Sequence, residues 1–240
     1  MRTAQVVRTG SGPQPRVFGV EFTEFGPQRI ADAVTGEPVP AGDGLRLMVT
    51  MNLDHAVNLR CNESFRRAYQ SARLVTADGF PIYLYARWRG ARLAGRVTGA
   101  DLFPLIMERL SPERHRPFLM VSDSETREVL EKQLLRSGFQ PGQYALTVPP
   151  HGFDVDRAAS EALFERIEEM RPTHIFMGLG SPKSEIWLDR HRVRLGDAYA
   201  FAFGAGLNFF AGTARRAPKL GREAGFEGAG GFTHQPRRPF

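Results

Sequence analysis

Three short polar segments of this sequence each follow an apolar run, and their side chains suit acid–base and anion-binding chemistry. Thr50-Met51-Asn52, Asp78-Gly79 and Gly178-Leu179-Gly180-Ser181-Pro182-Lys183 are the segments in chain order. A carboxylate can take a proton from a hydroxyl group, and glycine-rich segments that open helices let main-chain N–H groups approach a phosphate. Close strand–helix packing is the alternative role for Gly178 and Gly180, and for Gly204 and Gly206 further along.

Asp78-Gly79 has two structural interpretations. An Asp-Gly pair between apolar residues is typical of a tight β-hairpin, whereas an acid at the end of a buried strand that leads into a helix lies where α/β enzymes keep their chemistry. Pro81 decides between them, because it would remove a ladder hydrogen bond from a returning strand but is tolerated in the first turn of a helix. The sequence therefore favours a strand-to-helix connection.

Alternating strand and helix patterns must position these segments. We predict strands over residues 45–51, 73–77, 118–122, 144–148, 174–177 and 199–203, and helices over 125–136 and 154–170. The strands lack polar/apolar alternation, as expected of a parallel sheet covered on both faces. The fold class is α/β, a mainly parallel, Rossmann-like sheet whose ligand crevice lies beyond the carboxyl ends of the strands. We expect Asn52 to cap the helix after the first strand, and Ser181 to cap another with Pro182 at its first position.

The length of the chain predicts one main domain, and the distribution of its charge indicates a basic C-terminal segment. We expect a loose segment over 1–16, the α/β domain over 17–212, and a basic, Gly-rich appendage over 213–240. Residues 215–240 hold six basic and two acidic residues, so this segment carries +4 of the net +6. Such a segment suits phosphates, an anionic membrane surface or nucleic acid, or is simply solvated. The single cysteine and the absence of an apolar leader favour a cytoplasmic protein.

Several other site types are disfavoured. The six histidines show no spacing typical of a zinc site. Asp154 and Asp156 form a D-x-D pair, but they open an amphipathic helix and are interpreted as caps. A Rossmann-type dinucleotide-dependent oxidoreductase is the alternative function; it requires G-x-G-x-x-G after the first strand, where this chain has N-L-D-H-A-V. The basic tail belongs to no recognised nucleic-acid-binding module, so no nucleic-acid partner is expected.

Five motifs in register resemble the WecG/TagA/CpsF glycosyltransferase family. They are T-M-N at 50–52, A-D-G at 77–79, R-V-T-G-A-D at 96–101, G-L-G-S-P-K-S-E-I-W at 178–187, and A-G-T at 211–213 followed by R-A-P at 216–218. The resemblance implies a bacterial enzyme, peripheral at the inner face of the cytoplasmic membrane, that inverts the anomeric centre of a UDP-sugar without a metal or other cofactor. Its acceptor would be a polyprenyl-diphosphate-linked saccharide of cell-surface polysaccharide assembly, and the enzyme a possible homo-oligomer.

The resemblance also implies roles for individual residues. Asp78 falls on the general base, and the substrate pocket falls on Thr50, Asn52, Arg96 and Asp101. The nucleotide-binding residues would be Gly178, Gly180, Ser181, Lys183, Glu185, Gly204 and Gly206, with phosphate contacts from the tail residues Arg215, Arg216, Arg237 and Arg238. Two features depart from the family: Ser184 stands where glutamine is usual, and Gly228, Gly230 and Gly231 weaken a helical appendage.

Overall fold

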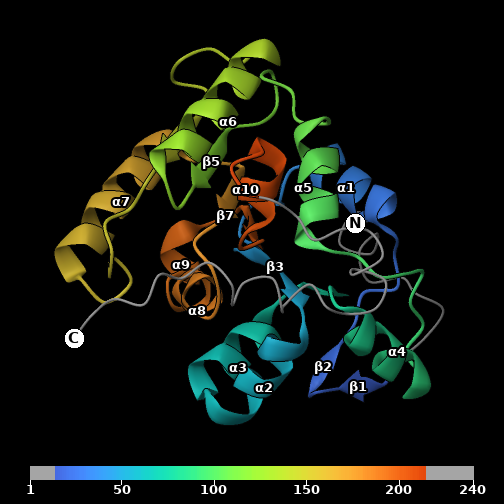
Figure 1. Cartoon of the computed structure of the whole chain (residues 1–240). Coiled ribbons are helices and arrows are strands. Elements are labelled where there is room, and N and C mark those ends of the chain that lie inside the picture. The colour runs from blue at the N-terminus through green and yellow to red at the C-terminus, as the bar shows by residue number, and fades with distance from the viewer. Residues whose placement is uncertain (1–13, 215–240) are drawn as a thin grey trace.

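A six-stranded, all-parallel sheet forms the centre of the protein in a computed structural model that describes residues 14–214 (Figure 1). Its order is β4-β3-β8-β7-β5-β6. The strands are β3 (Arg46–Met51), β4 (Leu74–Ala77), β5 (Pro117–Met120), β6 (Ala145–Thr147), β7 (His174–Met177) and β8 (Tyr199–Ala202). A separate antiparallel pair, β1 (Arg16–Val17) and β2 (Val20–Glu21), precedes them. The predicted α/β fold class is confirmed.

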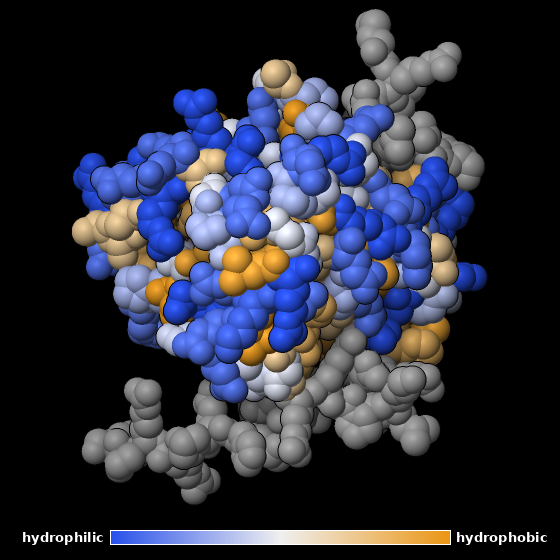
Figure 2. All heavy atoms as spheres, turned by 90° about the horizontal axis from the view of Figure 1, so that it is seen from above, coloured by the Kyte–Doolittle hydropathy of each residue, from blue (hydrophilic) through white to orange (hydrophobic). Residues whose placement is uncertain are grey.

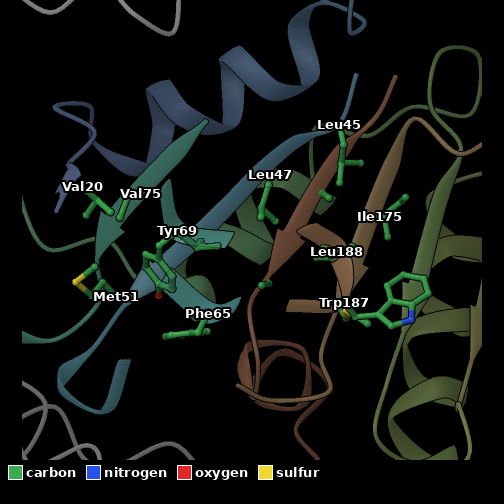
Figure 3. Packing of buried hydrophobic residues seen from close by; sticks show 14 of the residues in the cluster. Val20, Leu45, Leu47, Met51, Phe65, Tyr69, Val75, Ile175, Trp187 and Leu188 are labelled. Carbon is green, nitrogen blue, oxygen red and sulfur yellow. The ribbon is translucent and has the colours of Figure 1, made fainter. Parts of the chain in front are cut away.

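Successive side chains of the strands enter two different cores. On β3, Leu47, Val49 and Met51 belong to one hydrophobic cluster, whereas Met48 belongs to the other. The same alternation on β7 sends Ile175 and Phe176 to opposite faces. Because both faces are apolar, the strands read as continuous apolar runs. Figure 3 shows residues of the first of these cores, among them Leu47, Ile175 and Trp187.

Helices cover both faces of the sheet. On one face α5 packs on α1 and α10, with α6 beside α10; on the other, α3 packs on α2 and α8 (Figure 1). Buried residues of α4, α7 and α9 join the core on this second face, which is the core drawn in Figure 3. The bounds are α1 (Pro27–Gly36), α2 (Leu53–Cys61), α3 (Glu63–Ser71), α4 (Phe80–Trp88), α5 (Gly99–Met107), α6 (Ser124–Arg136), α7 (Arg157–Met170), α8 (Lys183–Arg190), α9 (Arg192–Leu195) and α10 (Gly206–Ala211).

The connection at Asp78-Gly79 runs from β4 into α4, as predicted. Gly79 has φ −106°, an extended conformation open to any residue, and Pro81 stands in the first turn of α4. The pair therefore forms no hairpin. The chain enters the helix beside Asn52: a Cβ added at Gly79 would lie 3.8 Å from the Asn52 Cα, an ordinary van der Waals contact.

Two predicted helix starts differ from the structure. The helix predicted from residue 154 begins at Arg157, because Asp156 is its cap and accepts hydrogen bonds from the N–H groups of Ala158 and Ala159. The prediction that Ser181 caps the next helix is wrong. Pro182 occupies the N-cap position of α8, Lys183 is the first helical residue, and no side chain of the described segment caps this end.

Candidate active site at the carboxyl edge of the sheet

The ends of β3 and β4 bring Asn52 and Asp78 together. These strands pair in parallel register, Met51 opposite Ala77, and the Asp78 N–H donates to the Met51 carbonyl oxygen at 2.8 Å. The Asn52 side chain caps α2 by accepting from the His55 N–H at 3.0 Å. Both side chains are half-buried, so they are held by main-chain geometry and remain within reach of a ligand.

Arg96 joins the same site from the segment between α4 and α5. Its guanidinium donates to the main-chain carbonyl of Asp78 at 3.3 Å, and the following residue, Val97, donates its N–H to Ala77 at 2.9 Å. Two residues on, Thr98 caps α5 by accepting from the Asp101 N–H at 3.0 Å. The structure thus brings Asn52, Asp78 and Arg96 to one edge of the sheet, with Asp101 in the first turn of the next helix.

A buried network beneath Thr50 holds the end of β3. The carbonyl oxygen of Thr50 lies 2.8 Å from the His55 Nδ1 and accepts from the Tyr69 hydroxyl at 3.1 Å, and these two side chains are themselves 2.8 Å apart. Figure 3 shows the Tyr69 ring beneath the sheet close to Met51. Sequence reasoning missed His55 and Tyr69, because no spacing in the chain signals a contact between two helices.

The first turn of α8 contributes a buried acid, Glu185, and the segment just before the helix contributes an exposed hydroxyl, that of Ser181. Burial raises the pKa of the Glu185 carboxyl to about 7, an effect partly offset by its own main-chain N–H and by the Ser181 hydroxyl. Its Oε2 has no hydrogen-bond partner among the described residues. Burial also raises the pKa of the Tyr69 phenol, and the charges of Glu185 and Asp78 add to that rise. Tyr69 is therefore electrostatically coupled to both carboxyl groups.

The four glycines predicted to bind nucleotide fall into two pairs. A Cβ at Gly178 would lie 3.0 Å from the Leu207 side chain, and one at Gly206 would lie 3.1 Å from the Ala100 main-chain nitrogen. These two glycines permit close packing of α10. Gly180 and Gly204 have positive φ, and a Cβ there would have no neighbour within 4 Å among residues 14–214. Main-chain approach by a ligand is thus open at Gly180 and Gly204.

A cluster of polar side chains beyond the end of β5 holds the last described residues of the chain in place. The Asn208 amide of α10 donates to the Asp123 carboxylate and to Thr126 Oγ1, each at 2.9 Å. The hydroxyls of Thr126 and Thr213 are 2.6 Å apart. The start of the basic segment is therefore attached to the carboxyl edge of the sheet. Arg215, Arg216, Arg237 and Arg238 lie outside the described residues.

Within residues 14–214, no group of three or more His, Cys, Asp or Glu side chains could hold a metal ion. A hollow of about 490 Å³ lies at the opposite edge of the sheet, before β5 and β7, between Arg116, Thr173 and Arg194. No helix of the described segment is long and apolar enough to cross a membrane.

Fold and site together define an α/β enzyme of the Rossmann-like class. The chain belongs to the Glycosyl transferase WecG/TagA/CpsF family, whose model matches residues 15–240. It is therefore a glycosyltransferase and not the dinucleotide-dependent oxidoreductase that was the alternative. It is similar to a Staphylococcus aureus (strain MRSA252) protein, N-acetylglucosaminyldiphosphoundecaprenol N-acetyl-beta-D-mannosaminyltransferase. The two are 24% identical over 180 residues, which cover 75% of this chain and 68% of that protein.

Proposed function

We propose that this enzyme transfers a sugar from a UDP-sugar to a polyprenyl-diphosphate-linked saccharide in the assembly of a bacterial cell-surface polysaccharide. The observation that carries the proposal is the meeting of three half-buried residues, Asp78, Asn52 and Arg96, at the carboxyl edge of the sheet. The acceptor class follows the name of the Staphylococcus aureus relative, which acts on a lipid-diphosphate-linked N-acetylglucosamine.

Asp78 acts as the general base of an inverting transfer. Its carboxylate takes the proton from the acceptor hydroxyl as that oxygen attacks the anomeric carbon of the donor. The new glycosidic bond forms on the face opposite the departing UDP, so one displacement inverts the configuration. Asn52 and Thr50, at the end of the adjacent strand, orient the acceptor, and Asp101 contacts it from the first turn of α5.

The departing UDP needs charge stabilisation rather than a proton, because its diphosphate is a good leaving group. Arg96 and Lys183 supply positive charge, and the α8 N-terminus, which no side chain caps, supplies main-chain dipoles. The open main chain at Gly180 and Gly204 allows close approach of the diphosphate. The tail arginines Arg215 and Arg216 follow directly after the segment attached to this edge through Thr213. Transfer by these groups requires no metal ion.

The lipid-linked acceptor gives the enzyme a peripheral location at the inner face of the cytoplasmic membrane. A polyprenyl chain remains in the bilayer, so the site must be presented at the membrane surface for the saccharide to reach Asp78. Self-association remains a separate expectation of the sequence.

A donor panel tests this function. Purified full-length protein is incubated with individual UDP-sugars and a short-chain polyprenyl-diphosphate N-acetylglucosamine, with and without a chelator, and products are identified by mass spectrometry. We expect an acceptor extended by one hexose or N-acetylhexosamine, with inverted anomeric configuration and a rate unaffected by the chelator. Hydrolysis of the UDP-sugar without acceptor extension, or transfer only with added metal, would contradict the proposal.

A further inference from the structure

The helix that begins beside Asp78 carries an exposed apolar stripe. Phe80, Leu84 and Trp88 of α4 recur every four residues and lie on one side, while Ile82 and Ala86 enter the core on the other. Trp88 is 78% exposed and Leu84 is 50% exposed. The exposure of these side chains means that the stripe lacks a partner within the described chain. Helix positions that face water are normally polar, so an exposed apolar stripe indicates an interaction surface.

Aromatic neighbours widen the stripe into a continuous surface. Tyr85 contacts Trp88 with ring centroids 5.7 Å apart, and Phe18, from the turn between β1 and β2, lies 5.2 Å from Tyr85. We call Phe18, Phe80, Leu84, Tyr85 and Trp88 the α4 face. Leu53 and Val57 form a second exposed apolar pair on α2, the helix that begins at the adjacent strand end.

Positive charge accompanies the α4 face. Residues 79–100 contain four arginines and no acidic residue. Arg87 and Arg89 are exposed and donate to the hydroxyls of Tyr83 and Tyr85, at 3.2 and 2.9 Å, and neither forms an ion pair with a described residue. By contrast, the face of the protein seen in Figure 2, over α6, is mostly hydrophilic with scattered hydrophobic residues.

We propose that the α4 face docks this enzyme on the surface of an anionic lipid bilayer. Trp and Tyr favour the membrane–water interface, apolar stripes insert at the boundary with the acyl chains, and arginines attract anionic headgroups while their stems remain apolar. A second copy of the chain fits less well, since a symmetric pair would bring Arg87 and Arg89 of one copy close to those of the other.

Docking through the α4 face would bring the carboxyl edge of the sheet, and with it the active site, close to the membrane surface. The first residue of α4, Phe80, stands two positions after Asp78, and α2 begins directly after Asn52. Both helix starts, with their exposed Phe80 and Leu53, therefore border the carboxyl edge of the sheet. This inference rests on the proposed function for its lipid-linked acceptor, but the surface itself is tested without any substrate.

Tryptophan fluorescence tests the α4 face directly. Of the two tryptophans, Trp88 is exposed and Trp187 is 1% exposed, so lipid-borne quenchers report on Trp88. Full-length protein is mixed with vesicles of phosphatidylcholine alone or with phosphatidylglycerol, some carrying brominated acyl chains. We expect a blue shift and bromine quenching with phosphatidylglycerol, absent in Trp88→Phe. We also expect vesicle affinity about tenfold lower in Leu84→Ser/Trp88→Ser and in Arg87→Gln/Arg89→Gln.

Val193→Ser is the matched control, because Val193 is 92% exposed on α9, away from the α4 face. It should bind vesicles like the native protein. No vesicle binding, or binding that leaves Trp88 unquenched and survives the Leu84/Trp88 change, would overturn the proposal. A lipid-independent, concentration-dependent shift of Trp88 would overturn it in favour of a second copy. Transfer to a water-soluble, short-chain acceptor is measured in parallel, so failure of docking and failure of the proposed function are distinguishable.

Discussion

The Asp78 N–H donates to the Met51 carbonyl oxygen at 2.8 Å, which makes Asp78 and Asn52 the first residues beyond two paired strands. Their proximity is thus a property of the sheet register and needs no long loop. Gly79, the next residue, also lies beside Asn52, since a Cβ added there would make an ordinary van der Waals contact with the Asn52 Cα at 3.8 Å. This geometry supports Asp78 as the base and Asn52 as its neighbour in substrate binding.

Asn52 and Asn62 cap their helices with the same geometry, so a comparison of variants at the two positions distinguishes an effect on stability from an effect on activity. Asn52 accepts from His55 N–H at 3.0 Å, and Asn62 caps α3 by accepting from Phe65 N–H at 3.0 Å. Asn52→Ala and Asn62→Ala should each lower the free energy of unfolding by about 1 kcal/mol. Transfer activity should fall about tenfold or more in Asn52→Ala alone. Equal activity in the two variants would remove Asn52 from the site.

Glu185 should make stability fall as pH rises. Its pKa is about 7 in the folded protein against an ordinary 4.5, so the folded state binds more protons in that window. The free energy of unfolding should therefore decrease from about pH 4.5 to about pH 7 and then level off. Glu185→Gln cannot ionise, and its stability relative to the native protein should increase by roughly 1–3 kcal/mol over that window. The free energies of unfolding are measured by denaturant titration of both proteins at each pH. A difference between the two proteins that stays constant with pH would contradict a buried Glu185 with a raised pKa.

His174 should make stability fall on acidification. Burial lowers the pKa of this imidazole from 6.5 to about 3, with a further contribution from the charge of His115, while the Val34 carbonyl opposes the shift. The unfolded chain therefore binds more protons between these values, and stability is lost as pH falls from about 6.5 towards 3. His174→Gln should remove roughly 2–5 kcal/mol of this pH dependence in urea titrations. An unchanged pH dependence in the His174→Gln variant would contradict a His174 that is buried in its neutral form.

Gly206 should be intolerant of a side chain for packing reasons. A Cβ there would lie 3.1 Å from main-chain atoms of Gly99 and Ala100, which cannot move as a flexible side chain can. Gly206→Ala should destabilise the protein by about 1–3 kcal/mol. Gly95→Ala is the matched change, since its Cβ would have no neighbour within 4 Å, and it should be neutral or slightly stabilising in thermal unfolding. Equal stability of the two variants would contradict the close α5–α10 packing.

Much of the fold was predictable because local pattern and tertiary structure agree. All six strands of the sheet lie at the predicted positions within two residues, since burial on both faces leaves continuous apolar runs. Pro81 correctly indicated that Asp78-Gly79 leads into a helix. Helix starts were harder: residues 151–155 form turns, and Asp156 caps α7 only because the Asp156 N–H bonds to the Gly152 carbonyl in such a turn.

The parts of the site that sequence reasoning missed are contacts between distant elements. His55 and Tyr69 meet at the Thr50 carbonyl from two different helices. The burial of Glu185 depends on how α8 packs against α3. The sequence did not predict the α4 face, because residues 80–88 are almost all apolar and their pattern does not show which side of the helix packs against the core. The predicted roles of the tail arginines lie outside the described residues and stay predictions.

Turnover by Asp78→Asn tests the central claim most directly. Asparagine keeps the shape of the side chain and both main-chain contacts of this residue, to Met51 and Arg96, but cannot accept a proton. With a UDP-sugar and a lipid-diphosphate acceptor, we predict a kcat about 10² to 10⁴ times lower than native, with the free energy of unfolding within about 1 kcal/mol. Asp54→Asn, a change to an exposed acid in the first turn of α2, should leave kcat unchanged. Native kcat in the folded Asp78→Asn protein would contradict the account.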